Sequence, residues 1–150
     1  MDISKLLNEK HVILDLQGKD KISVIRELAD ALDNGGRLLD KEAYITDVLK
    51  REEIASTGVE MGVAIPHGKS AGVKEPSLAF GRSKDGIDFE SMDGNKTDLV
   101  FLIAVPENSD DTHIRILNNF ARKLMHKEFR EGLRNAQTSE EIMNLLNDQG

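Results

Sequence analysis

The stretch Leu99-Val100-Phe101-Leu102-Ile103-Ala104-Val105 is apolar at every position, and Pro106 follows it. A strand that faces water on one side alternates apolar and polar residues. A strand that is buried on both faces has no such alternation, and this run is typical of one. We therefore expect residues 99–105 to form a central strand of a sheet, with other elements packed on both faces of the sheet.

Helical periodicity occurs both before and after this run. Apolar residues from Ile22 to Leu32 recur every three to four positions, which indicates a helix that starts after Asp20 and ends at Asn34-Gly35-Gly36. A second helix is expected from an N-cap at Asp40 to Arg51. A third should follow Asp110-Asp111, with an apolar stripe of Ile114, Leu117, Ala121 and Leu124, and a short fourth should start near Lys127. The capping box Thr138-x-x-Glu141 predicts the start of the last helix.

Short apolar or β-branched segments predict the other strands. They cover 11–16, 63–65 and 77–83, and a hairpin turn is expected at 92–95. Pro66 should end the second segment or confine it to a sheet edge, because proline has no backbone N–H for a sheet hydrogen bond. These elements are interspersed along the chain. The predicted class is therefore α/β, a mixed β-sheet flanked by helices on both faces, in a single domain over residues 1–150.

The composition excludes several classes of protein. The chain carries 20 Lys and Arg against 27 Asp and Glu, a formal net charge of −7. This balance argues against nucleic acid and anionic membrane as main partners, because both attract clustered Lys and Arg. The absence of cysteine excludes thiol catalysis, disulfides and Cys-ligated zinc. No apolar run approaches the ~18–20 residues of a membrane span and the first residues do not form a signal peptide, so we expect a cytoplasmic protein.

The four histidines are the candidates for chemistry near neutral pH. His67 follows a short strand and a proline and precedes Gly68. Its ring is therefore expected at a strand end, where α/β sheets usually bind ligands, although a merely exposed residue explains the position equally well. His113 lies just inside an expected helix N-terminus, which attracts anions, but a plain polar first-turn residue also fits. His11 and His126 are expected to be structural or exposed.

Three familiar kinds of site fail on spacing. The segment from Gly62 to Ser70 resembles a phosphate-binding P-loop, but five residues instead of four separate its glycines, and Pro76 prevents the long helix that a P-loop opens. His67 and His113 lack the H-E-x-x-H spacing of metal ligands, and no G-x-S-x-G segment is present. We expect neither a metal nor a cofactor. What remains is a histidine that accepts a transferable group as a nucleophile.

Several segments together resemble a known family. They are Arg51-Glu52-Glu53, Ser56-Thr57-Gly58, Gly62-Val63-Ala64-Ile65-Pro66-His67-Gly68-Lys69 and Asp111-x-His113-Ile114-x-x-Leu117. In this combination the sequence resembles the fructose/mannitol-type (type 2) enzyme IIA domain of the bacterial phosphoenolpyruvate-dependent sugar phosphotransferase system (PTS), and most of all its fructose-specific branch. The resemblance covers nearly the whole chain.

The resemblance implies a phosphotransferase that relays a phosphoryl group during sugar uptake, with fructose as the expected sugar. It implies that His67 takes the group from the phosphocarrier protein HPr and passes it to a cysteine of a IIB domain. Arg51 matches the arginine beside the phosphohistidine, and His113 matches the second active-site histidine. The membrane is then involved only indirectly, through the permease complex, and the family fold is likewise a mixed sheet flanked by helices.

Some alternatives remain open at this point. Nitrogen-regulatory relatives share the fold and the phosphohistidine but control target proteins by binding them, and a fragment of a transcriptional regulator is a third interpretation. Glu60 stands where the family commonly has glycine, and we expect its side chain to point outward because it would oppose the charge of a phosphate. Met61 and Ile65 form either a partner-contact surface or part of the core.

Overall fold

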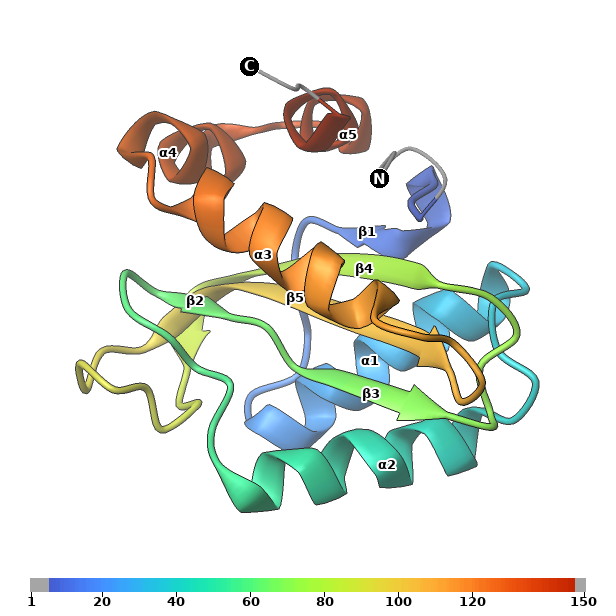
Figure 1. Cartoon of the computed structure of the whole chain (residues 1–150). Helices are drawn as coiled ribbons and strands as arrows, with labels where there is room; N and C mark the ends of the chain where they lie inside the picture. Colours follow the sequence, from blue (N-terminus) through green and yellow to red (C-terminus); the bar gives the residue numbers. More distant parts are fainter. Residues whose placement is uncertain (1–5, 148–150) are drawn as a thin grey trace.

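The structure, a computed structural model, describes residues 6–147, apart from the side chains of Thr112, His113 and Phe120. A mixed β-sheet lies between two layers of helices (Figure 1). In chain order the elements are the 3-10 turn η2 (Glu9–His11), β1 (Val12–Ile13), α1 (Lys21–Asn34), α2 (Lys41–Ile54), β2 (Val63–Ala64), β3 (His67–Ser70), β4 (Ser77–Ile87), β5 (Thr97–Pro106), α3 (Thr112–Leu124), α4 (Lys127–Asn135) and α5 (Ser139–Asn147).

The sheet is organised around β5, as the apolar run predicts. β5 pairs antiparallel with β4 on one side and parallel with β2 and β3 on the other, and β1 pairs parallel with β4. Every side chain from Leu99 to Val105 is fully buried. The predicted fold class is therefore confirmed.

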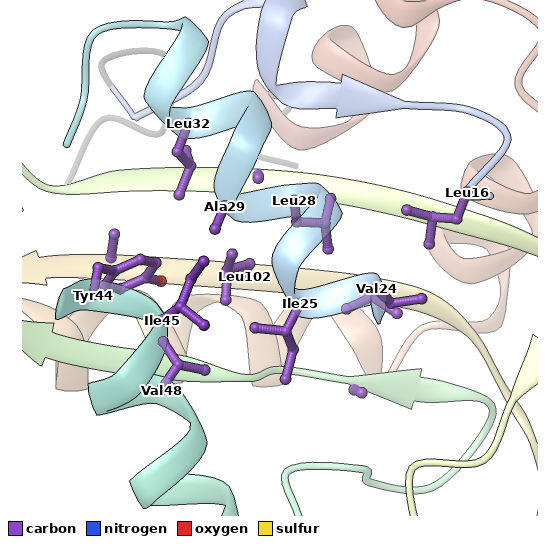
Figure 2. Close-up of a cluster of buried hydrophobic side chains, with 14 of the residues drawn as sticks. Leu16, Val24, Ile25, Leu28, Ala29, Leu32, Tyr44, Ile45, Val48 and Leu102 are labelled. Carbon is purple, nitrogen blue, oxygen red and sulfur yellow. The ribbon is translucent and has the colours of Figure 1, made fainter. Parts of the chain in front are cut away.

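Alternate side chains of β5 enter two hydrophobic cores, because successive residues of a strand point to opposite faces. On one face Val100, Leu102 and Ala104 pack against α1 and α2, in the cluster drawn in Figure 2. On the other face Phe101 and its neighbours pack against buried residues of the three C-terminal helices, among them Ile116, Leu133, Ile142 and Leu146. Figure 1 shows the same division, with α1 and α2 on one side of the sheet and α3, α4 and α5 on the other.

Three helices, α1, α2 and α5, begin where the sequence predicts their starts. Oδ1 of Asp20 accepts a hydrogen bond from the backbone N–H of Ser23 at 2.8 Å, and Oδ1 of Asp40 accepts one from Ala43 at 3.1 Å. At α5 the hydroxyl of Thr138 accepts from the backbone N–H of Glu141 at 3.1 Å. Each of these bonds satisfies a donor that the first turn of a helix leaves unpaired.

Three details differ from the sequence predictions. The strand expected over 11–16 is limited to Val12–Ile13, because the side chain of Asn8 caps a 3-10 turn that ends at His11. β4 continues beyond the expected end at residue 83 to Ile87, with an irregular register after Arg82. The stripe expected to bury α3 is also partly wrong, since Ile114 is exposed and Ile116 is the residue that enters the core.

Candidate active site

β2 and β3 behave as one edge strand that carries His67. Val63 pairs with Leu99 and His67 pairs with Ile103, four residues further along both strands, so the register does not change across Pro66. The carbonyl of Pro66 accepts a hydrogen bond from the N–H of Ile103 at 3.0 Å. The prediction that Pro66 ends the strand or confines it to a sheet edge is confirmed, because β2 ends at Ala64, β3 begins at His67, and both pair with β5 at the edge of the sheet.

The ring of His67 is half-buried, and its position follows from strand alternation. Val63, Ile65 and His67 share one face of the strand, and Val63 belongs to the core beneath α3, α4 and α5. The Nδ1 atom of His67 lies 2.9 Å from the carbonyl oxygen of Ile65. A carbonyl only accepts hydrogen bonds, so this contact requires the proton on Nδ1. In the neutral ring, Nε2 is then the nitrogen that carries the lone pair.

Arg51 lies in the last turn of α2, and α2 is anchored directly to the strand pair that holds His67. The buried hydroxyl of Tyr44 donates to the carbonyl of Ile103, the partner of His67 in the sheet, at 2.8 Å. A Cβ on Gly68 would approach the Val48 side chain to 2.8 Å, so glycine is required where α2 crosses β3. The Arg51 guanidinium donates to the carbonyl of Ala55 at 2.9 Å, which fixes it at the C-terminus of the helix.

His113 is the second residue of α3, as the sequence predicts, and α3 lies on the face of the sheet to which His67 points. Its side chain is outside the described residues. The structure thus brings the end of α2, the start of β3 and helix α3 around one edge of the sheet. The roles of Arg51 and His113 toward His67 remain predictions.

Glu52 is a buried carboxylate beside this site that sequence reasoning named only as part of a motif. It pairs with Nζ of Lys21 at 3.0 Å, and both side chains are largely shielded from water. It also accepts hydrogen bonds from the hydroxyl and from the backbone N–H of Thr57. Its position after Arg51 near the end of a helix gave no sign of burial, because most charged residues at such positions are exposed.

The loop before β2 is held in a demanding conformation. Met61 has a positive φ of 67°, a region that side chains other than glycine seldom adopt. Its N–H donates to Asp93 at 3.2 Å, and its carbonyl accepts from Arg134, which also binds Asp98 through two nitrogens at 2.7 and 3.0 Å. Asp98 raises the pKa of Arg134 by hydrogen bonding to its charged form.

Glu60 itself does not have a positive φ, so replacing the glycine of the family pattern at this position strains no backbone. Its side chain is exposed.

A groove of about 500 Å³ continues from the His67 face of the edge strand. Ile65 and Val63, which precede His67 on that face, line it together with exposed Met61, Met92 and Met125. Its other lining residues are Val59, Glu60, Ala121, Leu124 and Arg130. Met61 is 54% exposed, so the interpretation of Met61 as a core residue is wrong. The predicted apolar stripe of α3 contributes Ala121 and Leu124 to this groove.

Among residues 6–147, leaving aside the side chains that are not described, no group of three His, Cys, Asp or Glu is arranged to hold a metal ion. None of the helices within that range is long and apolar enough to cross a bilayer.

Comparison with known proteins identifies the family. Residues 5–149 match the family described as "Phosphoenolpyruvate-dependent sugar phosphotransferase system, EIIA 2". The chain is 42% identical over 147 residues to the PTS system fructose-specific EIIABC component of Bacillus subtilis, covering 98% of this chain and 23% of that protein. It is 37% identical over 145 residues to the PTS system fructose-specific EIIA component of Haloferax volcanii, covering 97% and 94%.

A solved structure agrees with this assignment. The nitrogen regulatory protein IIA-Ntr from Neisseria meningitidis superposes with a TM-score of 0.84 at 32% identity, covering 96% of this chain and 98% of that chain. The resemblance found in the sequence is therefore confirmed over nearly the full length, although the chain spans under a quarter of the Bacillus protein. We conclude that this chain belongs to the EIIA 2 family of the phosphoenolpyruvate-dependent sugar phosphotransferase system, and that it is a phosphotransferase.

Proposed function

We propose that His67 is the phosphorylated residue, and that the chain takes a phosphoryl group from HPr and passes it to a IIB cysteine during fructose uptake. The observation that carries this proposal is the hydrogen bond between Nδ1 of His67 and the Ile65 carbonyl on an edge strand. The names of two relatives, both fructose-specific PTS components, support the sugar. The EIIABC name of the Bacillus relative supports a partnership with a B component.

The proposed chemistry uses the neutral imidazole. Nε2 attacks phosphorus in line, a bond forms between Nε2 and phosphorus, and the bond between phosphorus and the donor atom of HPr breaks. The Nδ1 proton stays on the ring and continues to bind the Ile65 carbonyl. In the second transfer a thiolate of the IIB domain attacks phosphorus, the bond to Nε2 breaks, and the neutral ring is regenerated. Each transfer leaves the tautomer unchanged, so the chain is ready for the next cycle.

We assign the stabilisation of phosphoryl charge to Arg51 and to the first turn of α3. The guanidinium of Arg51 is suited to bind two phosphoryl oxygens at once. The first turn of a helix attracts anions through its backbone N–H groups, and His113 lies in the first turn of α3. Both interactions must strengthen in the transition state more than in the phosphorylated intermediate, because a phosphohistidine that is held too tightly would not pass its group on.

The test is phosphorylation of the purified chain by labelled phospho-HPr. We expect His67→Ala to abolish the acid-labile label without unfolding the chain, and Arg51→Ala to slow transfer by about 10²- to 10³-fold. His126→Ala is the matched control, because His126 is exposed between α3 and α4, and it should be labelled like the wild type. An acid-labile label on His67→Ala would refute the assignment, and an unchanged rate in Arg51→Ala would remove that residue from the site.

A regulatory role is the second candidate, because the IIA-Ntr protein of Neisseria is 32% identical to this chain. The two relatives named fructose-specific have higher identity, which favours transport. A panel of purified IIB proteins separates the two functions. Transfer of the label to a fructose-type IIB supports the relay, whereas retention of the label with every IIB protein would favour regulation.

A further inference from the structure

The buried ion pair of Glu52 and Lys21 is connected to His67 through hydrogen bonds. Glu52 accepts from the hydroxyl and the N–H of Thr57. The carbonyl of Thr57 accepts from the N–H of Ile65 at 3.1 Å. The carbonyl of Ile65 in turn accepts from Nδ1 of His67 at 2.9 Å. An unbroken line of polar contacts therefore runs from the end of α2 to the imidazole.

We propose that Glu52 is a positioning residue, which fixes the Ile65 carbonyl through Thr57 and so sets the tautomer and orientation of the His67 ring. This inference rests on the proposed role of His67 as the phosphoacceptor. It assigns to Glu52 no contact with the phosphoryl group. Glu52 acts on the ring through the backbone of the edge strand, on the side of that strand that does not pair with β5.

The chemistry of the pair suits this role. A buried carboxylate is costly unless it is paired and fully hydrogen-bonded, so its partners are held in fixed geometry. Lys21 pairs with one oxygen of Glu52 and lies 5.5 Å from the centre of the buried Phe89 ring, which limits its movement. Hydrogen bonds to a charged acceptor are about twice as strong as neutral ones. Thr57 is therefore held more firmly than an ordinary loop residue.

The surrounding loop supports the same segment. The Ser56 hydroxyl donates to the carbonyl of Phe89, and the N–H of Gly58 donates to the Ser56 side chain at 3.0 Å. The N–H of Val59 donates to the carbonyl of Val63 at 2.8 Å. Residues 57–59 thus follow the outer edge of β2, and Glu52 is the charged group that ties them to α2. Glu52 also adjoins Arg51 in sequence, so one side chain couples the helix end to the strand.

The experiment measures single-turnover transfer from phospho-HPr together with the ¹⁵N chemical shifts of the His67 ring. We expect Glu52→Ala to lower the rate at saturating HPr by about 10- to 100-fold, as is usual when a group that orients an active residue is lost. The half-saturating HPr concentration should stay unchanged, and the ring should become a mixture of tautomers. Glu52→Gln retains an acceptor oxygen for Thr57 and should restore the single tautomer and most of the rate.

Two controls separate positioning from stability. Glu42 lies on α2, like Glu52, and Glu42→Ala removes an exposed ion pair with Arg26 of α1, so it should change neither readout. Leu32→Ala destabilises the core beneath α1, away from this line of hydrogen bonds, and should lower the melting temperature without altering the His67 tautomer. If Glu52→Ala does not fold, Thr57→Val provides the test, because it removes the hydroxyl that binds Glu52 and should shift the ring in the same direction.

A wild-type tautomer and a transfer rate within about twofold of wild type in Glu52→Ala would overturn the inference. An equal change of tautomer in Leu32→Ala would also overturn it. Failure of the proposed function gives a different result, since the wild-type chain would then carry no label on His67, while the ¹⁵N shifts would still report whether Glu52 holds the ring.

Discussion

The ring of His11 lies inside the protein, between the start of β1 and the end of α1, where a Cβ on Gly35 would collide with its Nε2. Burial lowers the pKa of His11, and the positive charge of Arg37 lowers it further. The carbonyl groups of Leu6 and Leu78 oppose this shift only in part. His11 is thus a titratable group in the core, which decides between the structural and the exposed positions that the sequence left open.

The lowered pKa predicts how stability depends on pH. Below about pH 6.5, the ordinary pKa of histidine, His11 binds a proton in the unfolded chain, whereas in the folded chain it binds this proton only at a lower pH. The free energy of unfolding should therefore fall as the pH drops from 6.5 toward the lowered pKa, by at most about 1.4 kcal/mol per pH unit for this group. In urea unfolding between about pH 5 and 7, we expect His11→Gln to reduce this slope and His126→Gln to leave it unchanged. Equal slopes in wild type and His11→Gln would contradict the assignment.

At the scale of single residues, the sequence indicates residue types that are chemically distinctive, such as histidine. It does not indicate a common residue type that becomes important only through burial in the fold. His67 stands out as a candidate because a histidine beside proline and glycine is distinctive, although an exposed residue fits the position equally well. Glu52 does not stand out, because its importance comes from burial against Lys21 and Thr57, residues that are 31 and five positions away. A carboxylate in the last turn of a helix is normally solvated, so the sequence contained no signal of this contact.

Among the elements, the loop before β2 depends on a side chain from α4. Arg134 joins Asp98 and the carbonyl of Met61, and this pair is about a quarter to a third exposed. We expect Arg134→Lys to lower the free energy of unfolding by about 1 kcal/mol, because lysine cannot bind a carboxylate through two nitrogens and partial exposure reduces the contribution of the charge. Lys127→Arg, at an exposed position of the same helix, is the control and should be neutral.

Urea unfolding measures the stability of Arg134→Lys. The HPr concentration that gives the half-maximal transfer rate measures whether the variant alters the groove. Met61 borders the groove, so a loosened loop should raise this concentration. An unchanged stability in Arg134→Lys would show that the bidentate geometry contributes little.

The order and type of the elements were largely predictable, and their ends were less so. Caps such as Asp20, Asp40 and Thr138 act locally, and each was found where the sequence placed it. Pro66 lies at the sheet edge, as its missing N–H predicts, and the parallel pairing of β2 and β3 with β5 keeps one register on either side of it. The exposed face of α3 was misjudged, since an apolar stripe that lines a groove has the same periodicity as one that enters a core.

The molecule as a whole has two cores that share one strand. Phe101 and Leu102 are adjacent in β5 and point into different cores. We expect Phe101→Ala to cost about 3–5 kcal/mol and Leu102→Ala about 2–5 kcal/mol of stability. Because the same strand supports both layers, each variant should still unfold in one transition. Tyr44 is the sole tyrosine, and the chain has no tryptophan, so its fluorescence reports the α1–α2 side, while circular dichroism reports all helices.

Coincident curves from the two probes would support a single cooperative unit, and separate midpoints in either variant would show that the layers unfold independently. The apolar run at 99–105 was sufficient to predict a sheet covered on both faces. It did not determine which helices cover which face, because that depends on how the strands are ordered in space.

The segment at 57–59 has a consequence for the molecule in concentrated solution. Exposed sheet borders can recruit strands from neighbouring chains and so begin aggregation. Here the outward-facing backbone groups of Val63 and Ile65 are already bonded to the chain's own loop, through Val59 and Thr57. The stretch that leads to His67 is therefore already paired within the chain and closed to strands of other copies.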